Sequence, residues 1–201
     1  MMILRSSPPS PFGRKVRIAA DVAGLSSRID IVVADTIDPG DSLRRQNPLG
    51  KIPVLMLDSG QAIFDSRVII EYLDLLAGGG ALIPREPEAR IRALTLQALA
   101  DGILDACILQ VYEARFREEA KRDANWLKYQ SEKTARALAA LEVGPPPASS
   151  DVGAITLACA LGYLDLRFAG AWRQDHPRLV AWLDEFSGRV ASFEATRFIP
   201  V

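Results

Sequence analysis

A glycine-rich break near the middle of the chain constrains the fold more than any other feature. The sequence Gly-Gly-Gly-Ala-Leu-Ile-Pro at residues 78–84 follows a region where apolar runs of strand length alternate with helical patterns. After the break, every long segment has helical periodicity. We therefore expect an α/β domain over residues 1–77, a linker over residues 78–86 and an all-helical domain over residues 87–201.

The first part is predicted to contain four strands and three helices. The strands are expected at residues 2–6, 29–33, 52–57 and 62–64. The helices are expected at residues 11–23, 39–45 and 66–76, the second of them short and irregular. The last two strands are separated by a turn of sequence Asp-Ser-Gly-Gln, so they should form a hairpin. The resulting order is βαβ, an irregular helix, then ββα.

The second part is predicted to be entirely helical. Helices are expected at residues 87–122, 124–143, 151–168 and 177–189, with a short turn or helix from residue 190. The segment 151–168 is strongly apolar, so we expect it at the centre of a second hydrophobic core.

Composition narrows the classes of function. The net charge is −1 and no Lys/Arg-rich run occurs, which argues against nucleic acid or an anionic membrane as partner. Cys107 and Cys159 lie far apart in helical patterns and are expected to be buried thiols. The single histidine, His176, argues against a histidine-based metal site, so no metal is expected. No apolar stretch approaches the ~18 residues of a membrane span, so a cytoplasmic location is expected.

The stretch Ser10-Pro11-Phe12-Gly13 lies where the first strand gives way to the first helix. Serine is favoured at the N-cap of a helix and proline at its first position. A hydroxyl is therefore presented beside unpaired backbone N–H groups and the positive end of the helix dipole. Such a place can hold an anion or favour a thiolate. The alternative is that Ser10 only caps its own helix by accepting from the N–H near Gly13.

Three stretches, in this order and followed by a helical half, resemble the soluble glutathione S-transferases of bacteria. They are Ser10-Pro11-Phe12, the Asn-Pro-Leu-Gly-Lys-Ile-Pro-Val-Leu sequence at residues 47–55, and Phe64-Asp65-Ser66. Near the C-terminus, the sequence at residues 176–189 is similar to the penultimate helix of that family. The resemblance implies an α/β thioredoxin-like N-terminal domain with a mixed four-stranded sheet, an all-α C-terminal domain, and a homodimer.

The resemblance also implies a site for glutathione, which acts as substrate and requires no metal. The Ile52–Pro53 peptide is implied to be cis, with the backbone of Ile52 pairing with the cysteinyl residue of glutathione. Asp65 and Ser66 are implied to hold the γ-glutamyl end at a helix N-terminus, where a plain helix cap is the alternative. Lys51 could reach the glycyl carboxylate, or it could simply be solvated. The implied glutathione-binding residues are Ser10, Phe12, Lys51, Ile52, Pro53, Asp65 and Ser66.

Ser10 is implied to be the catalytic residue. Because a free thiol has a pKa near 8.5, a hydroxyl that donates to sulfur would favour the reactive thiolate. Ser6 and Ser7 are alternatives, although two prolines separate them from the helix. No cysteine precedes Cys107, which argues against the cysteine-dependent thiol–disulfide and dehydroascorbate-type activities of the family.

The second substrate, a small electrophile, is expected between the domains against the first long helix. Leu96, Ile103, Ala106 and Tyr112 could line its site, although core packing is their alternative role. Asp101 and Asp105 share a helix face around Gly102, which is unfavourable unless something compensates, and two readings stay open. One is a partner chain or a polar cleft at this point, and the other is a solvated face with an incidental glycine.

Two kinds of function are compatible with these features. The first is a glutathione transferase that adds the thiolate of glutathione to an electrophile, or a related enzyme for isomerisation, dehalogenation or peroxide reduction. The second is a glutathione-binding protein without catalysis, serving as a stress-response, chaperone-like or scaffolding subunit. The electrophile pocket decides among the reactions, and one sequence does not define that pocket.

Overall fold

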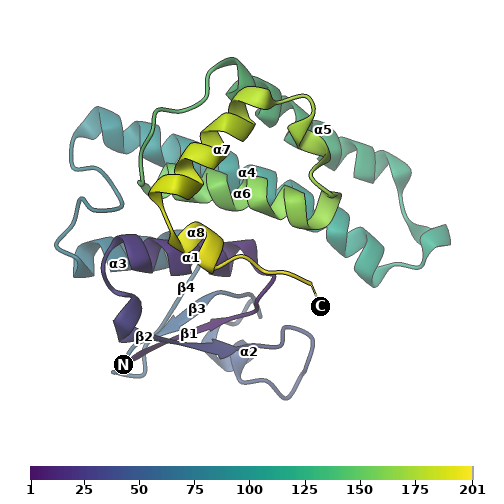
Figure 1. The fold of residues 1–201 in the computed structure, drawn as a ribbon. Helices are drawn as coiled ribbons and strands as arrows, with labels where there is room; N and C mark the ends of the chain where they lie inside the picture. Colours follow the sequence, from purple (N-terminus) through teal and green to yellow (C-terminus); the bar gives the residue numbers. More distant parts are fainter. Residues whose placement is uncertain (201) are drawn as a thin grey trace.

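A computed structural model describes residues 1–200, and Figure 1 shows an α/β half below a helical half. The elements of the α/β half are β1 (Met2–Ser6), α1 (Pro11–Val22), β2 (Ile29–Val33), α2 (Leu43–Gln46), β3 (Val54–Met56), β4 (Ala62–Phe64) and α3 (Ser66–Leu76). The helices of the second half are α4 (Pro87–Phe116), α5 (Ala124–Val143), α6 (Val152–Phe168), α7 (Pro177–Arg189) and α8 (Ser192–Ala195). Three short 3-10 helices lie at residues 26–28, 119–121 and 171–173.

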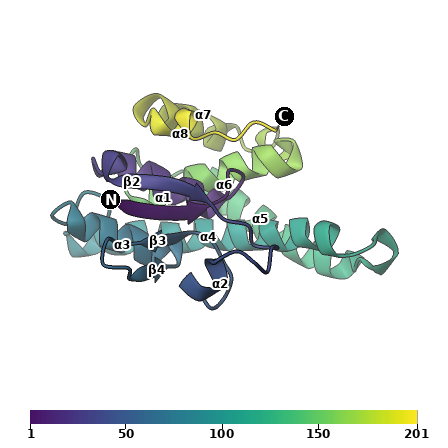
Figure 2. The same cartoon turned by 90° about the horizontal axis from the view of Figure 1, so that it is seen from below.

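The four strands form one mixed sheet in the order β2-β1-β3-β4. Strand β1 pairs parallel to β2 and antiparallel to β3, and β3 pairs antiparallel to β4. Helices α1 and α3 lie on the side of the sheet that faces the helical half, and α2 packs on the other side (Figures 1 and 2). The predicted thioredoxin-like half with a mixed four-stranded sheet, followed by a helical region, is confirmed.

Helix α6 lies at the centre of the molecule rather than in a separate second core. Its first ten residues, 152–161, are all buried, as the strongly apolar pattern predicts. The main hydrophobic cluster runs without interruption from Leu4 of β1 and Ile18 of α1 into Leu157 of α6 and Phe186 of α7. The two halves therefore share one core, and the position of α1 depends on its packing against α6.

The predicted linker is tied down rather than loose. Both carboxylate oxygens of Asp74 accept from backbone N–H groups beyond α3, at 3.0 Å from Gly80 and 2.7 Å from Leu82. The Leu82 carbonyl in turn accepts from Val152 at the start of α6, at 2.8 Å. Leu82 and Ile83 are buried in the core, so this part of the segment is fixed in place, while most of its other residues are exposed.

Several predicted boundaries were wrong. Helix α4 ends at Phe116 rather than near residue 122, because Arg117 is extended and the Arg122 side chain donates to the carbonyls of Ala114 and Arg117. Helix α2 begins at Leu43 rather than at residue 39. Side chains of acidic residues bond the backbone N–H groups of the preceding loop and hold it out of helical form. Strand β3 covers only residues 54–56 of the predicted 52–57.

Helix α4 is long and apolar enough to meet a criterion for a membrane span, although no such segment was expected from the sequence. Among the described residues it is the one helix whose length and composition would suffice to cross a membrane. The core helix of a soluble protein meets the same criterion. Here α4 packs along α6 and α5 and contributes buried side chains to the shared core.

Gly153 in the first turn of α6 allows a close approach to α4. A Cβ atom at this position would lie 2.6 Å from the Ala93 carbonyl oxygen and 3.0 Å from the Leu96 Cβ. We expect Gly153→Ala to destabilise the fold by about 1–3 kcal/mol, because overpacking against backbone outweighs the helix propensity of alanine. Chemical denaturation measures this change. Gly188→Ala in α7 is the matched control, since nothing lies within 4 Å of its Cβ position. Equal stability of both variants would contradict the close approach.

Candidate functional site

The N-terminus of α1 has the predicted capping geometry. Ser10 is the N-cap residue, Pro11 occupies the first helical position, and the Ser10 Oγ accepts from the Gly13 N–H at 3.1 Å. Gly13 is required here, since a Cβ atom would lie only 1.8 Å from the Oγ of buried Ser6. Ser6 is therefore packed beneath the helix, which favours Ser10 over Ser6 as the hydroxyl presented at this turn.

The N-terminus of α3 is formed by a strained residue. Asp65 is the N-cap with a φ of 69°, one of two non-glycine residues among those described with positive φ. Its carboxylate accepts from the Arg67 backbone N–H at 2.9 Å and lies 3.3 Å from the Arg67 guanidinium. Burial alone would raise the pKa of Asp65, but the hydrogen bonds and charge of Arg67 lower it overall. An ionised carboxylate and a helix N-terminus thus lie side by side.

The loop before β3 approaches the same place. The Ile52–Pro53 peptide is cis, as the resemblance implies. Within residues 1–200, the N–H and C=O of Ile52 form no hydrogen bond, so both are available to an added strand. The Asn47 side-chain amide holds the loop by donating to the Lys51 carbonyl at 2.9 Å. Lys51 itself is exposed.

Six of the seven predicted glutathione-binding residues line one cavity of about 200 Å³, which we call the aspartate cavity. Its lining residues are Phe12, Asn47, Leu49, Lys51, Ile52, Pro53, Phe64, Asp65, Ser66, Arg67, Asp101 and Asp105. The exception is Ser10, which lines a neighbouring cavity. Because Ser10 and Phe12 are two residues apart, the start of α1 borders both cavities.

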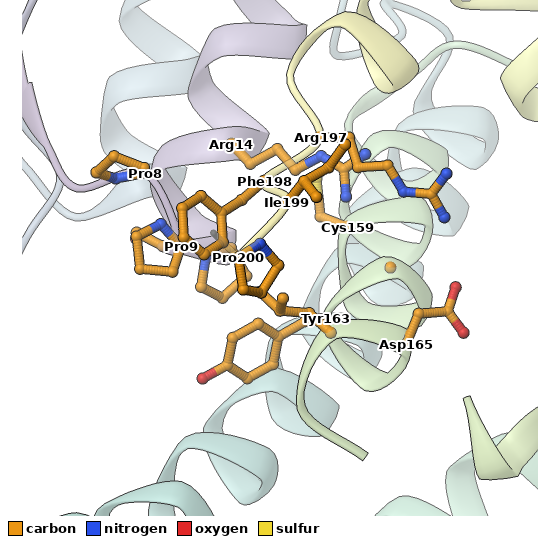
Figure 3. A pocket seen from close by; sticks show the side chains of 14 residues that line it. Pro8, Pro9, Arg14, Cys159, Tyr163, Asp165, Arg197, Phe198, Ile199 and Pro200 are labelled. Carbon is orange, nitrogen blue, oxygen red and sulfur yellow. The ribbon is translucent and has the colours of Figure 1, made fainter. Parts of the chain in front are cut away.

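The neighbouring cavity, which we call the proline cavity, has a volume of about 390 Å³ (Figure 3). Its wall combines the turn before α1, one face of α6 and the C-terminal segment 197–200. The lining residues are Pro8, Pro9, Ser10, Pro11, Arg14, Cys159, Gly162, Tyr163, Asp165, Leu166, Arg197, Phe198, Ile199 and Pro200. Of the α4 residues suggested for the electrophile site, Leu96, Ile103, Ala106 and Tyr112 line neither cavity, whereas Asp101 and Asp105 line the aspartate cavity. Ile103 and Ala106 are buried in the core instead.

A buried ion pair compensates the repulsion between Asp101 and Asp105 of α4. The Lys15 Nζ of α1, which is fully buried, lies 2.7 Å from the Asp101 Oδ1, and Asp101 is only 5% exposed. Burial lowers the pKa of Lys15, and the charge of Asp101 opposes that shift. Burial and the neighbouring Asp101 raise the pKa of Asp105. Lys15 thus offsets the repulsion between the two carboxylates.

The second carboxylate oxygen of Asp101 has no hydrogen-bond partner within residues 1–200. Its Oδ2 is buried without a hydrogen bond among the described residues, and the Arg67 Nε lies 3.9 Å from it. An unsatisfied buried acceptor at the wall of a cavity is the place for a donor from a ligand. A polar cleft at Asp101 and Asp105 was one of the two readings open from the sequence, whereas nothing in the sequence placed Arg67 in the site. The i, i+4 pair of aspartates was the signal that could have identified Asp101.

The cysteines are unsuited to redox chemistry. Both are fully buried, and burial raises the pKa of Cys107 and of Cys159 to about 11. Cys159 lines the proline cavity, yet at neutral pH it is almost wholly the unreactive thiol. Within residues 1–200, no group of three or more histidine, cysteine or acidic side chains could hold a metal ion.

Comparison with known proteins agrees with the geometry. Residues 9–76 match the family model described as "Glutathione S-transferase, N-terminal domain". The "Uncharacterized GST-like protein YibF" of Escherichia coli strain K12 is 36% identical over 94% of this chain and 95% of its own length. A glutathione transferase family member from Pseudomonas fluorescens Pf-5, solved with bound glutathione, is 46% identical with a TM-score of 0.92, and each chain is covered completely. A glutathione S-transferase from Methylobacillus flagellatus KT with glutathione bound is 36% identical, with a TM-score of 0.91 and coverage of 99% of this chain and 100% of its own.

Proposed function

Because the chain belongs to the glutathione S-transferase family, we propose that it binds glutathione in the aspartate cavity and transfers it to a small electrophile. The observation that carries this proposal is the joint presence of Ile52, Asp65, Ser66 and the unpaired Asp101 Oδ2 around one cavity. Full-length relatives with bound glutathione support the same ligand. In this proposal, residues 1–77 form the glutathione-binding domain and residues 87–201 form the helical domain that helps to line the electrophile site. Residues 78–86 link the two domains.

Each end of glutathione has a counterpart in the cavity. The γ-glutamyl carboxylate accepts from the Ser66 N–H and hydroxyl at the α3 N-terminus. The ammonium group donates to the Asp65 carboxylate and to the Asp101 Oδ2, which would otherwise stay unsatisfied. The backbone of Ile52 pairs with the cysteinyl residue, and Lys51 faces the glycyl carboxylate.

The sulfur of glutathione then lies at the start of α1, which borders both cavities. The Ser10 Oγ already accepts from the Gly13 N–H, and its own hydrogen remains free to donate to sulfur. That hydrogen bond and the helix N-terminus stabilise the thiolate over the thiol. The thiolate sulfur then forms a bond to an electrophilic carbon in the proline cavity, and the group displaced from that carbon leaves with the bonding electrons.

The experiment combines binding and turnover. Calorimetry with glutathione and with its desamino analogue tests the ammonium site, and we expect the analogue to bind about tenfold or more weakly. Assays of glutathione consumption with several classes of electrophile then test catalysis. Equal affinity for the two ligands would remove Asp65 and Asp101 from the ammonium site. Glutathione binding without turnover in any class would favour a non-catalytic binding protein.

We further propose a homodimer built on β4, α3 and α4. Phe64, Val68, Ile91 and Leu99 on these elements are exposed apolar side chains, and Phe64 also lines the aspartate cavity. We expect Val68→Glu to convert a dimer into monomers in analytical ultracentrifugation. The control is Val33→Glu on β2, at the opposite edge of the sheet, which should leave the dimer intact. A monomeric wild type would contradict this proposal.

A further inference from the structure

Arg14 differs from the other charged residues of the proline cavity because no carboxylate within residues 1–200 pairs with it at close range. It lies on α1 one turn after Ser10, so the two side chains share a helix face, and both line the cavity. Figure 3 shows Arg14 reaching from α1 toward Cys159 on α6. The Arg14 Nη1 is so close to α6 that a Cβ atom at Gly162 would lie 2.6 Å from it.

The hydrogen bonds of Arg14 leave one nitrogen unused. The Nε donates to the Thr196 Oγ1 at 3.2 Å, and Nη2 donates to the Phe193 carbonyl at 2.5 Å. The guanidinium also stacks over the Phe193 ring at 4.1 Å. Among residues 1–200, no acceptor bonds the Nη1, and no carboxylate lies within 4 Å of the side chain.

The other charged groups of the cavity are already paired. Asp165 binds Arg173 at 2.7 Å and also accepts from the Trp172 indole. Arg197 lies 3.2 Å from Glu194. Arg14 is therefore the one cation at this wall whose charge no neighbouring carboxylate within the described residues balances at close range. Burial lowers its pKa, which reflects the cost of an uncompensated charge away from water.

From this arrangement we infer that the proline cavity selects electrophiles that carry a carboxylate, which binds the Arg14 Nη1. A guanidinium is suited to a carboxylate, and the apolar prolines and Phe198 surround the rest of a short carbon chain. Ser10 and Arg14 are four residues apart, so their backbone positions differ by about 6 Å along the helix axis. The reacting carbon beside Ser10 and the carboxylate beside Arg14 then lie in one cavity of about 390 Å³, which suits a substrate with a short carbon chain. This inference rests on the proposed glutathione site.

The chemistry of a model substrate is simple. With iodoacetate, the thiolate sulfur forms a bond to the methylene carbon while the carbon–iodine bond breaks, and iodide leaves with the bonding electrons. The product is S-carboxymethylglutathione. Iodoacetamide reacts in the same way and gives S-carbamidomethylglutathione, which has nearly the same shape but no charge.

Calorimetry with these two products tests the inference without depending on turnover. We expect the wild type to bind S-carboxymethylglutathione about tenfold or more tightly than S-carbamidomethylglutathione. In Arg14→Gln the ratio should fall to about one. In the matched control Arg197→Gln, which changes the other arginine of the cavity, the wild-type ratio should persist.

A second variant is needed because Arg14→Gln also removes the hydrogen bonds of Arg14 to Phe193 and Thr196. Gly162→Ala keeps the arginine but displaces its Nη1, so the preference for the acid should also decrease. Equal binding of both products to the wild type, alongside normal binding of glutathione, would overturn the inference and leave the proposed function intact. Absence of binding by glutathione and both products would overturn the proposed function, and this inference with it.

Discussion

Replacing Ser10 with alanine is expected to lower turnover about 10- to 100-fold while changing the affinity for glutathione less than about threefold. A hydrogen bond to a charged group contributes roughly 1.5–3 kcal/mol, and each 1.4 kcal/mol corresponds to a factor of ten. The effect falls on turnover because the hydroxyl acts on the sulfur, whereas the γ-glutamyl end is held at α3. Steady-state kinetics and calorimetry on the same preparation separate the two quantities.

Two variants control for the capping role of Ser10. Alanine also removes the hydrogen bond from the Gly13 N–H, at a cost of about 1 kcal/mol, so the melting temperature must be measured in parallel. Ser10→Thr keeps both the cap and the hydroxyl and should retain most of the turnover. Ser7→Ala removes the remaining alternative hydroxyl and should leave turnover unchanged. Unchanged turnover in Ser10→Ala would remove this serine from the mechanism.

Changes at the α3 N-terminus are expected to lower the affinity for glutathione, in contrast to the change at Ser10, which lowers turnover. Asp65→Asn and Ser66→Ala should each weaken the binding of glutathione about tenfold or more, because each loses a charged or hydroxyl partner of the γ-glutamyl group. Asparagine has nearly the same shape as aspartate and is equally favoured at an N-cap, so this change tests the charge alone. Calorimetry measures the affinity.

The matched control for Asp65→Asn is Asp21→Asn, which removes a carboxylate from an exposed position of α1. It should bind glutathione as the wild type does. Wild-type affinity in both Asp65→Asn and Ser66→Ala would move the ligand away from the α3 N-terminus and contradict the proposed placement.

Local patterns were enough to predict most of the fold and part of the site. The cap at Ser10-Pro11 and the cap at Asp65 follow from side-chain chemistry within three residues, and both occur where predicted. The buried face of α6 follows from a run of apolar residues. The cis peptide at Ile52–Pro53 came from the family resemblance, since most X–Pro bonds in folded proteins are trans.

Features that depend on distant segments were not predictable in this way. Lys15 and Asp101 are 86 residues apart. The i, i+4 aspartates indicated that some group offsets their repulsion, but nothing in the sequence identified that group as Lys15. Arg14 bonds a carbonyl 179 residues later, so its place in the proline cavity depends on how α8 packs on α1. The early end of α4 has a local cause, the Arg122 side chain that folds back on the carbonyls of Ala114 and Arg117, but no sequence pattern indicated it.

The pKa of the glutathione thiol in the complex tests the central claim most directly. Ultraviolet absorbance of the thiolate, followed against pH with saturating enzyme, measures it. The account predicts a pKa at least one unit below the value near 8.5 of a free thiol, and a return toward that value in Ser10→Ala. A wild-type complex whose thiol titrates as free glutathione does would contradict it.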